Sequence, residues 1–225
     1  MKNFTDLIKA SFEIYKQKIK SILKLMIIFW GISMIFGVLI SLMSPESIIE
    51  NGGYFALLFV LGLCLFVVFL YSFIIFSFVL LAIKPVGTEL KEIFQDVWKK
   101  LWQYILIILL VGFFTLLSFL LLFIPGIIVG VHLMFCSYVL VAEGGKGMNV
   151  LKRSWALVKG NWWKVFGRII LLNLIVMIIF SIFNSVNNLL GSLFQYLCIP
   201  FSMIFMYLIY LELKKSKEIQ IQPQA

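Results

Sequence analysis

The chain is 225 residues long, with 63% hydrophobic and only 13% charged residues, and its mean hydropathy is +1.09. Soluble domains are about half apolar, so a chain of this size cannot cover so many apolar side chains with polar surface. A soluble globular fold is therefore excluded, and lipid must surround most of the chain. The net charge of +9 has to be explained within that setting.

Four stretches of the sequence contain no Lys, Arg, Asp or Glu, and their lengths predict the number of membrane spans. A transmembrane helix needs roughly 20 apolar residues. The stretches of 21 and 33 residues therefore hold one span each, and those of 42 and 43 residues hold two each. The four stretches are Leu25–Pro45, Asn51–Ile83, Leu101–Ala142 and Ile169–Leu211.

Turn-forming residues predict where the two longest stretches reverse direction. We expect one turn at Pro125-Gly126 and the other within Asn184–Gly191. The sequence thus predicts an all-α, polytopic membrane protein with six transmembrane helices. The fourth of these, Ile127–Ala142, is short for a span, and a re-entrant hairpin is the alternative there.

The cations lie on one side of the predicted spans. All 19 Lys and Arg fall in four segments, and the connections on the other side carry only Glu46 and Glu50. Cytoplasmic loops of membrane proteins are rich in Lys and Arg, so we expect both termini and the large loops in the cytoplasm. The four basic segments are 1–24, 84–100, 143–168 and 212–225.

The N-terminal segment does not have the features of a cleavable signal peptide, because it lacks a short apolar core followed by small residues. Cys64, Cys136 and Cys198 fall in separate predicted spans. We expect them to be packing residues and not disulfide partners or metal ligands.

A repeat is predicted from apolar stripes at the start of the three larger basic segments. Each stripe has the spacing i, i+4, i+7, i+11 of a helix with one apolar face, and a Lys follows its first residue. We expect three units of surface helix followed by a transmembrane hairpin, at about 4–83, 87–142 and 147–213, in a single domain 1–225 with a short tail 214–225. The stripes are Ile8, Phe12, Tyr15 and Ile19; Leu90, Phe94, Val97 and Leu101; and Leu151, Trp155, Val158 and Trp162.

The third stripe has the composition of a helix that lies in the headgroup layer, with Trp beside the apolar face and cations opposite. Gly160-Asn161 predicts its end. We expect three such cytoplasmic amphipathic helices to contact anionic lipid headgroups. The candidate headgroup residues are Lys9, Lys91, Lys152, Arg153, Trp155, Lys159, Trp162, Trp163 and Lys164.

Nearly the whole chain, and residues 124–172 above all, resembles a bacterial six-helix family that includes the membrane domain of glycerophosphoryl diester phosphodiesterases and the YciC-like and DUF975-like membrane proteins. The resemblance rests on Pro125, Gly126, Glu143, Ser154, Gly160 and Asn161, together with the surrounding Lys152-Arg153-Ser154-Trp155. It implies a membrane architecture and not an activity. Some members carry a hydrolase domain after the membrane unit, and we expect none here because the sequence ends at Ala225.

Residues able to perform chemistry are few. His132 is the only histidine, and an intramembrane His or Asn173 is a candidate polar site. We expect His132 to bond a Ser, an Asn or a backbone carbonyl, because acid–base and metal sites need partners that the spans lack. Glu143 and Glu212 lie at span ends, where we expect them to cap loops or to pair with Lys or Arg. No catalytic, metal or cofactor site is predicted.

These features favour a non-enzymatic protein of the bacterial plasma membrane that binds or organises anionic lipid or a membrane protein partner, the partner being another protein or a second copy of the chain. The alternative is a transporter component that binds a substrate or exports a hydrophobic peptide. A membrane enzyme acting on lipids is the third hypothesis. Nucleic acid is not expected as a partner, because topology already explains the positive charge.

Overall fold

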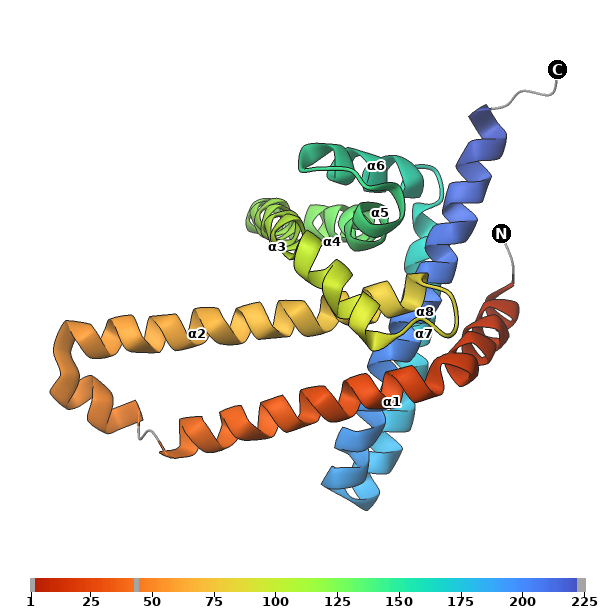
Figure 1. Ribbon diagram of the computed structural model, residues 1–225. Coiled ribbons are helices and arrows are strands. Elements are labelled where there is room, and N and C mark those ends of the chain that lie inside the picture. The colour runs from red at the N-terminus through yellow and green to blue at the C-terminus, as the bar shows by residue number, and fades with distance from the viewer. Residues whose placement is uncertain (1–2, 43–44, 222–225) are drawn as a thin grey trace.

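The computed structural model describes residues 3–42 and 45–221, and the described residues outside short turns are helical (Figure 1). No strand occurs in these two ranges, so the prediction of an all-α fold is confirmed. The helices of the described part are α1 (Phe4–Leu42), α2 (Pro45–Ile83), α3 (Leu90–Leu121), α4 (Phe123–Leu133), α5 (Cys136–Glu143), α6 (Met148–Val158), α7 (Trp162–Val186) and α8 (Asn188–Ile221).

Several of these helices can cross a membrane. Five segments of the described part are long and apolar enough, and they correspond to the second to sixth predicted spans. The first predicted span, Leu25–Pro45, includes residues 43–44, which lie outside the described residues. The five segments are Leu61–Ile83, Leu90–Leu121, Phe123–Glu143, Trp162–Val186 and Asn188–Ile219.

The prediction of three separate surface helices is wrong for the first two units. There the surface segment and the following span form one continuous helix, α1 and α3, whereas α6 and α7 are separate. Gly160 adopts φ 88° between α6 and α7, a conformation that glycine takes without strain. The aligned positions in the first two units are Gln17 and Lys99, which favour helix, so the chain continues straight through them.

The buried face of α1 lies one residue earlier than the predicted stripe. Leu7, Ser11 and Lys18 are buried, whereas Phe12 of the predicted stripe is 58% exposed. The same shift occurs in α6, where Ser154 is buried and Trp155 is 39% exposed. Aromatic residues therefore lie at the edge of the buried face and not at its centre.

The turn between α3 and α4 falls at Leu122, which is extended with φ −161° and ψ 146°. The prediction of a turn at Pro125-Gly126 is therefore displaced, because Pro125 lies in the first turn of α4. Proline is tolerated there since the first amides of a helix have no intrahelical acceptor. The other predicted turn is confirmed, because α7 and α8 meet at Asn187 within Asn184–Gly191.

The fourth apolar segment starts earlier than expected and is interrupted. It runs for 21 residues from Phe123 to Glu143, and Met134-Phe135 separate α4 from α5. This length removes the concern that the segment is too short for a span.

The helices pack together at one end of the molecule. Buried apolar side chains come from α1, the last turns of α2, the first half of α3, α4 to α6, the first half of α7 and the second half of α8. Phe76 of α2 stacks on Tyr104 of α3 with ring centroids 4.2 Å apart. In Figure 1 the α1–α2 hairpin extends from this core in one direction and the α7–α8 hairpin in another.

The far ends of the hairpins expose apolar side chains. Leu120 at the α3–α4 turn is 76% exposed and Val186 at the α7–α8 turn is 73% exposed. Apolar surface of this extent is unfavourable in water. The described side chains at the α3–α4 and α7–α8 turns therefore suit an apolar environment, whereas the core is where the protein packs against itself.

Candidate functional site

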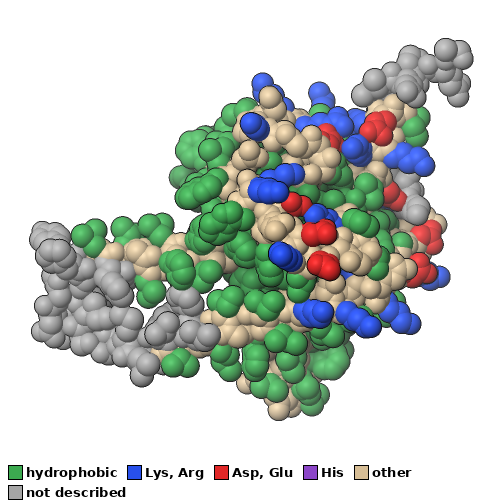
Figure 2. Space-filling model, viewed as in Figure 1, with side chains coloured by type: hydrophobic (Ala, Val, Ile, Leu, Met, Phe, Trp, Pro, Cys, Tyr) green, Lys and Arg blue, Asp and Glu red, His purple; other side chains and the backbone are tan. Residues whose placement is uncertain are grey.

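Charged side chains gather over the packed end of the molecule. Figure 2 shows Lys and Arg around α6, the C-terminal part of α8, the N-terminal part of α1 and the α2–α3 connection. The described atoms of the α7–α8 turn, at the opposite end of that hairpin, are apolar or neutral. The candidate site is therefore this charged face and the polar network beneath it.

Glu143, at the end of α5, is the centre of the network. Arg153 of α6 donates from Nε to Glu143 Oε2 at 2.7 Å and from a terminal nitrogen to Oε1 at 3.5 Å. The hydroxyl of Tyr210 on α8 donates to Oε1 at 2.7 Å, and Lys214 Nζ lies 3.9 Å from the same oxygen. One carboxylate thus joins the neighbouring helices α5 and α6 to α8, which is distant in the sequence.

The electrostatics of this network favour a fixed ion pair. The hydrogen bond to Glu143 raises the pKa of Arg153 above its ordinary value. The side chains of Arg153 and Glu143 are 33% and 20% exposed, so water screens the pair only in part. Both carboxylate oxygens of Glu143 accept hydrogen bonds from the protein, an arrangement that suits a structural role in holding α5, α6 and α8 together.

His132 lies directly beneath α6 and is used for packing. Its Nδ1 is 2.8 Å from the carbonyl oxygen of Ile128, and because a carbonyl can only accept, Nδ1 carries the proton. Its ring stacks on Trp155 with centroids 4.0 Å apart, and Ser154 donates to its carbonyl oxygen at 2.7 Å. The prediction of a backbone carbonyl partner is confirmed, and the described residues contain no cluster of three potential metal ligands.

The apolar face of α6 packs against the protein. Val150, Leu157 and Val158 are fully buried, and Leu151 is 4% exposed. Their contacts are within the hydrophobic core formed with α3, α4, α5 and α8. The apolar face of α6 is therefore already covered by the protein, and its charged side remains outside.

Most of the candidate headgroup cations are exposed. Lys9, Lys91, Lys152, Lys159 and Lys164 all lie on the surface. Arg153 differs, because it is bonded to Glu143. The structure thus separates the exposed lysines, which are available to a ligand, from an arginine that holds α6 in place.

The tryptophans of this region differ in exposure. Trp163 is 77% exposed and Trp155 is 39% exposed, whereas Trp162 is half-buried and stacks on Phe166 at 4.6 Å. The buried Nε1 of Trp162 has no hydrogen-bond partner among the described residues. Trp163 is the most exposed of the three.

The remaining motif residues have structural roles. A Cβ on Gly126 would lie 2.4 Å from the ring of Phe119, so only glycine lets α3 and α4 approach this closely. Asn161 precedes α7 without a side-chain cap. The side-chain nitrogen of Asn173 donates to the carbonyl of Ile169 at 2.9 Å within α7.

A buried lysine was missed by the sequence analysis. Lys18 is 6% exposed, and its Nζ donates to the carbonyl oxygens of Leu81, Ala82 and Lys84 at 2.7, 3.0 and 2.6 Å. Burial lowers its pKa to about 8, while the three carbonyl acceptors favour the charged form. A cation at this position caps the C-terminal end of α2, where the helix dipole is negative.

Two ion pairs fix neighbouring parts of the charged face. Arg168 of α7 bonds Glu212 of α8 at 2.8 Å, with side chains 11% and 14% exposed, and Lys84 bonds Asp96 at 2.5 Å. The expectation that Glu143 and Glu212 pair with cations is confirmed. Neither the Arg168–Glu212 pair nor the Lys84–Asp96 pair follows from sequence spacing, because helix packing brings the partners together.

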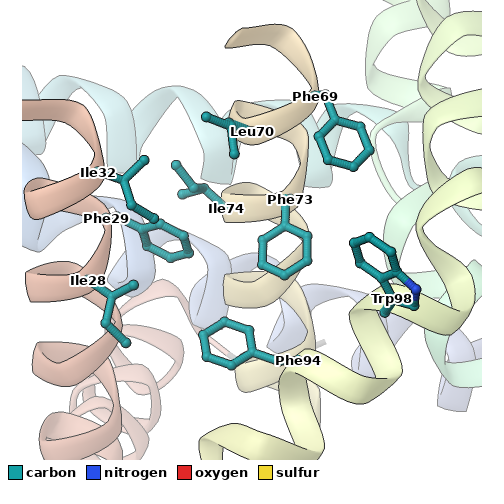
Figure 3. Close-up of a pocket in the computed structure, with 9 residues that line it drawn as sticks. All are labelled: Ile28, Phe29, Ile32, Phe69, Leu70, Phe73, Ile74, Phe94 and Trp98. Carbon is teal, nitrogen blue, oxygen red and sulfur yellow. The ribbon is translucent and has the colours of Figure 1, made fainter. Parts of the chain in front are cut away.

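Apolar grooves run beside α2. One, of about 360 Å³, lies between α1, α2 and α3 (Figure 3), and the other, of about 450 Å³, lies between α2 and α3. The first is lined only by apolar and aromatic side chains, and the second adds Ser72 and the hydroxyls of Tyr71 and Tyr104. Both suit a hydrophobic ligand.

Comparison with known proteins identifies one similarity. Residues 101–210, just under half of the chain, match the model of a domain of unknown function, DUF7847. No curated protein and no solved structure matches the chain. The matched region contains His132, Glu143, Arg153 and Tyr210, whereas α1 and α2 lie outside it.

Proposed function

We propose that this chain is a non-enzymatic, multi-pass protein of the bacterial plasma membrane that binds anionic phospholipid headgroups on its cytoplasmic face. In this proposal six helices span the bilayer and both termini are cytoplasmic. The observation that carries it is the confinement of all 19 Lys and Arg to four segments on one side of the predicted spans. The resemblance to the phosphodiesterase membrane-domain family belongs to the same proposal, and the DUF7847 match neither supports nor contradicts it.

Exposed lysines supply the attraction. Each cation near an anionic leaflet contributes on the order of 1 kcal/mol, and the contribution falls within a Debye length. Lys152, Lys159 and Lys164 lie on or beside α6, with Trp163 exposed next to them. Because the apolar face of α6 is buried in the protein, the proposed contact is electrostatic and not an insertion of this helix into lipid.

The polar network supports a structural and not a catalytic role for its residues. Glu143 accepts from Arg153 and Tyr210, and Glu212 bonds Arg168. His132 is stacked on Trp155 and bonded to Ile128. Acid–base catalysis needs a group within reach of a substrate proton, and each of these groups is engaged with the protein.

The test is binding of the purified full chain in neutral nanodiscs to anionic and neutral liposomes. We expect Lys152→Gln, Lys159→Gln and Lys164→Gln together to weaken binding to phosphatidylglycerol liposomes by at least tenfold. Binding to phosphatidylcholine liposomes should not change. Equal binding of both proteins to the anionic liposomes would sink the proposal.

A transporter component is the second candidate, and the apolar grooves favour a hydrophobic cargo for it. A transporter for a polar substrate would need polar groups near mid-bilayer, but the two grooves of the described residues are almost entirely apolar. We favour lipid binding because it also accounts for the exposed lysines. Movement of a labelled hydrophobic peptide across reconstituted vesicles would support the transporter instead.

The topology has its own test. Six spans in one bilayer require the α1–α2 and α7–α8 hairpins to run more nearly parallel than they do in Figure 1. In a background without Cys64, Cys136 and Cys198, Ile48→Cys should react with a membrane-impermeant thiol reagent in intact cells, and Lys146→Cys should not. The reverse pattern would invert the proposed orientation.

A further inference from the structure

The groove between α1, α2 and α3 is lined by apolar and aromatic side chains along its whole length. In Figure 3, Ile28 and Phe94 lie at one end of the groove, and Ile32, Phe69 and Leu70 lie at the other. Between them the walls are apolar, and the groove measures about 360 Å³. This volume lies within the range of ligand-binding pockets.

Lysines continue the walls beyond the first end. On α3, Lys91 precedes Phe94 by three residues and Trp98 by seven, so all three share one face of the helix. On α1, Lys24 lies four residues, about one turn, before Ile28. Both lysines are exposed, and neither forms an ion pair with another described residue.

The acidic residues nearby do not cancel this charge. Glu92 follows Lys91 directly and therefore lies on a different side of α3 from Phe94 and Trp98. Asp96 is bonded to Lys84. Trp98 is 69% exposed, and its indole has the apolar body and polar edge that suit the boundary between headgroups and acyl chains.

We propose that this groove is a binding site for a single phospholipid with an anionic headgroup. An acyl chain lies along the apolar walls from Phe94 towards Leu70, and the phosphate lies between Lys24 and Lys91. The inference rests on the proposed function and adds a specific site to it. This site is distinct from Lys152 and Lys159, which lie on and directly after α6.

The experiment uses the full chain in phosphatidylcholine nanodiscs with phosphatidylglycerol that carries a photoactivatable diazirine in its acyl chain. Cross-linked peptides are identified by mass spectrometry. We expect saturable labelling of peptides that contain Ile28–Ile32, Phe69–Ile74 or Phe94–Trp98, reduced by excess unlabelled phosphatidylglycerol and not by phosphatidylcholine.

Two variants test the site through different properties. Lys24→Gln with Lys91→Gln should weaken saturable labelling about 30-fold, as the loss of two lipid-facing cations implies. Leu70→Trp should abolish it by filling the groove without changing the charge. The matched control, Lys152→Gln with Lys159→Gln, should leave groove labelling within about twofold.

The outcomes separate the site from the wider function. If the α6 control loses liposome binding while the groove variants label normally, the site is overturned and the proposed function stands. If neither pair of variants changes binding, both fail. Equal labelling by a phosphatidylcholine probe overturns the site, and so do cross-links between two copies of the chain in place of lipid adducts.

Discussion

At the scale of single residues, Lys18 of α1 joins that helix to the C-terminal end of α2. Its ammonium donates to three carbonyl oxygens at the end of α2, so removing it leaves buried acceptors without a donor. We expect Lys18→Met to lower stability by about 1–3 kcal/mol, measured by thermal unfolding in detergent. Lys20→Met, at an exposed position on the same helix, is the control and should have little effect.

The burial of Lys18 could have been predicted from the sequence, but the predicted apolar stripe of the first unit lay one residue away from the face that is buried. Leu7, Ser11, Ile22 and Leu25 are buried on the same face as Lys18, so the lysine interrupts an otherwise apolar or small stripe. A lysine in such a position must find acceptors when the helix packs. Which acceptors it finds depends on where α2 ends relative to α1, and that is set by tertiary packing.

Glu143 can be tested in the same way. Glu143→Gln keeps the shape of the side chain but removes the charge that pairs with Arg153 and Lys214. We expect a loss of about 1–2 kcal/mol, moderated by partial exposure of the pair. A double-mutant cycle with Tyr210→Phe should give a coupling above about 0.5 kcal/mol, and independent effects would contradict the network.

At the scale of elements, close helix contacts depend on particular glycines. Gly126→Ala would place a methyl group 2.4 Å from the Phe119 ring, so α3 and α4 would have to separate or the ring would have to move. We expect lower thermal stability. Gly112→Ala on α3, which has nothing within 4 Å, is the control and should stabilise by about 0.5–1 kcal/mol.

The break between α6 and α7 is a second element-scale feature. Gly160 adopts φ 88°, and an alanine there would carry a strain of about 1–2 kcal/mol. Gly160→Ala should therefore destabilise the protein, whereas Gly167→Ala inside α7, with open space around it, should not. A more stable Gly160→Ala variant, seen in the same unfolding assay, would contradict this account of the break.

Helix ends differ in how well the sequence predicts them. Gly160-Asn161 and Asn184–Gly191 mark their breaks through residue type, and both predictions were correct. Leu122 interrupts the helix between α3 and α4. It is a leucine among apolar neighbours, so its residue type does not mark it as a turn residue. There the position of the turn follows from the packing of Phe119 against Gly126, which becomes visible only when the two helices are placed together.

At the scale of the whole molecule, charged side chains gather at the packed end, and apolar side chains are exposed at the α3–α4 and α7–α8 turns. Composition was enough to predict the helical membrane class, because no distribution of so few charges could solvate the chain in water. The paired network of Glu143, Arg153 and Tyr210 could not be predicted, because its members come from α5, α6 and α8. Long-range pairs of this kind require the three-dimensional arrangement.

This arrangement predicts the depth of individual positions in a bilayer. Leu120 is 76% exposed at the α3–α4 turn, and burying a leucine in apolar surroundings contributes about 1.5–3 kcal/mol, so it should lie in lipid. In a cysteine-free background, a spin label at Leu120→Cys should be more accessible to oxygen than to a water-soluble nickel complex. A label at Lys152→Cys, on the charged face, should show the opposite preference. Nickel accessibility at both positions would mean that the α3–α4 hairpin does not enter the membrane.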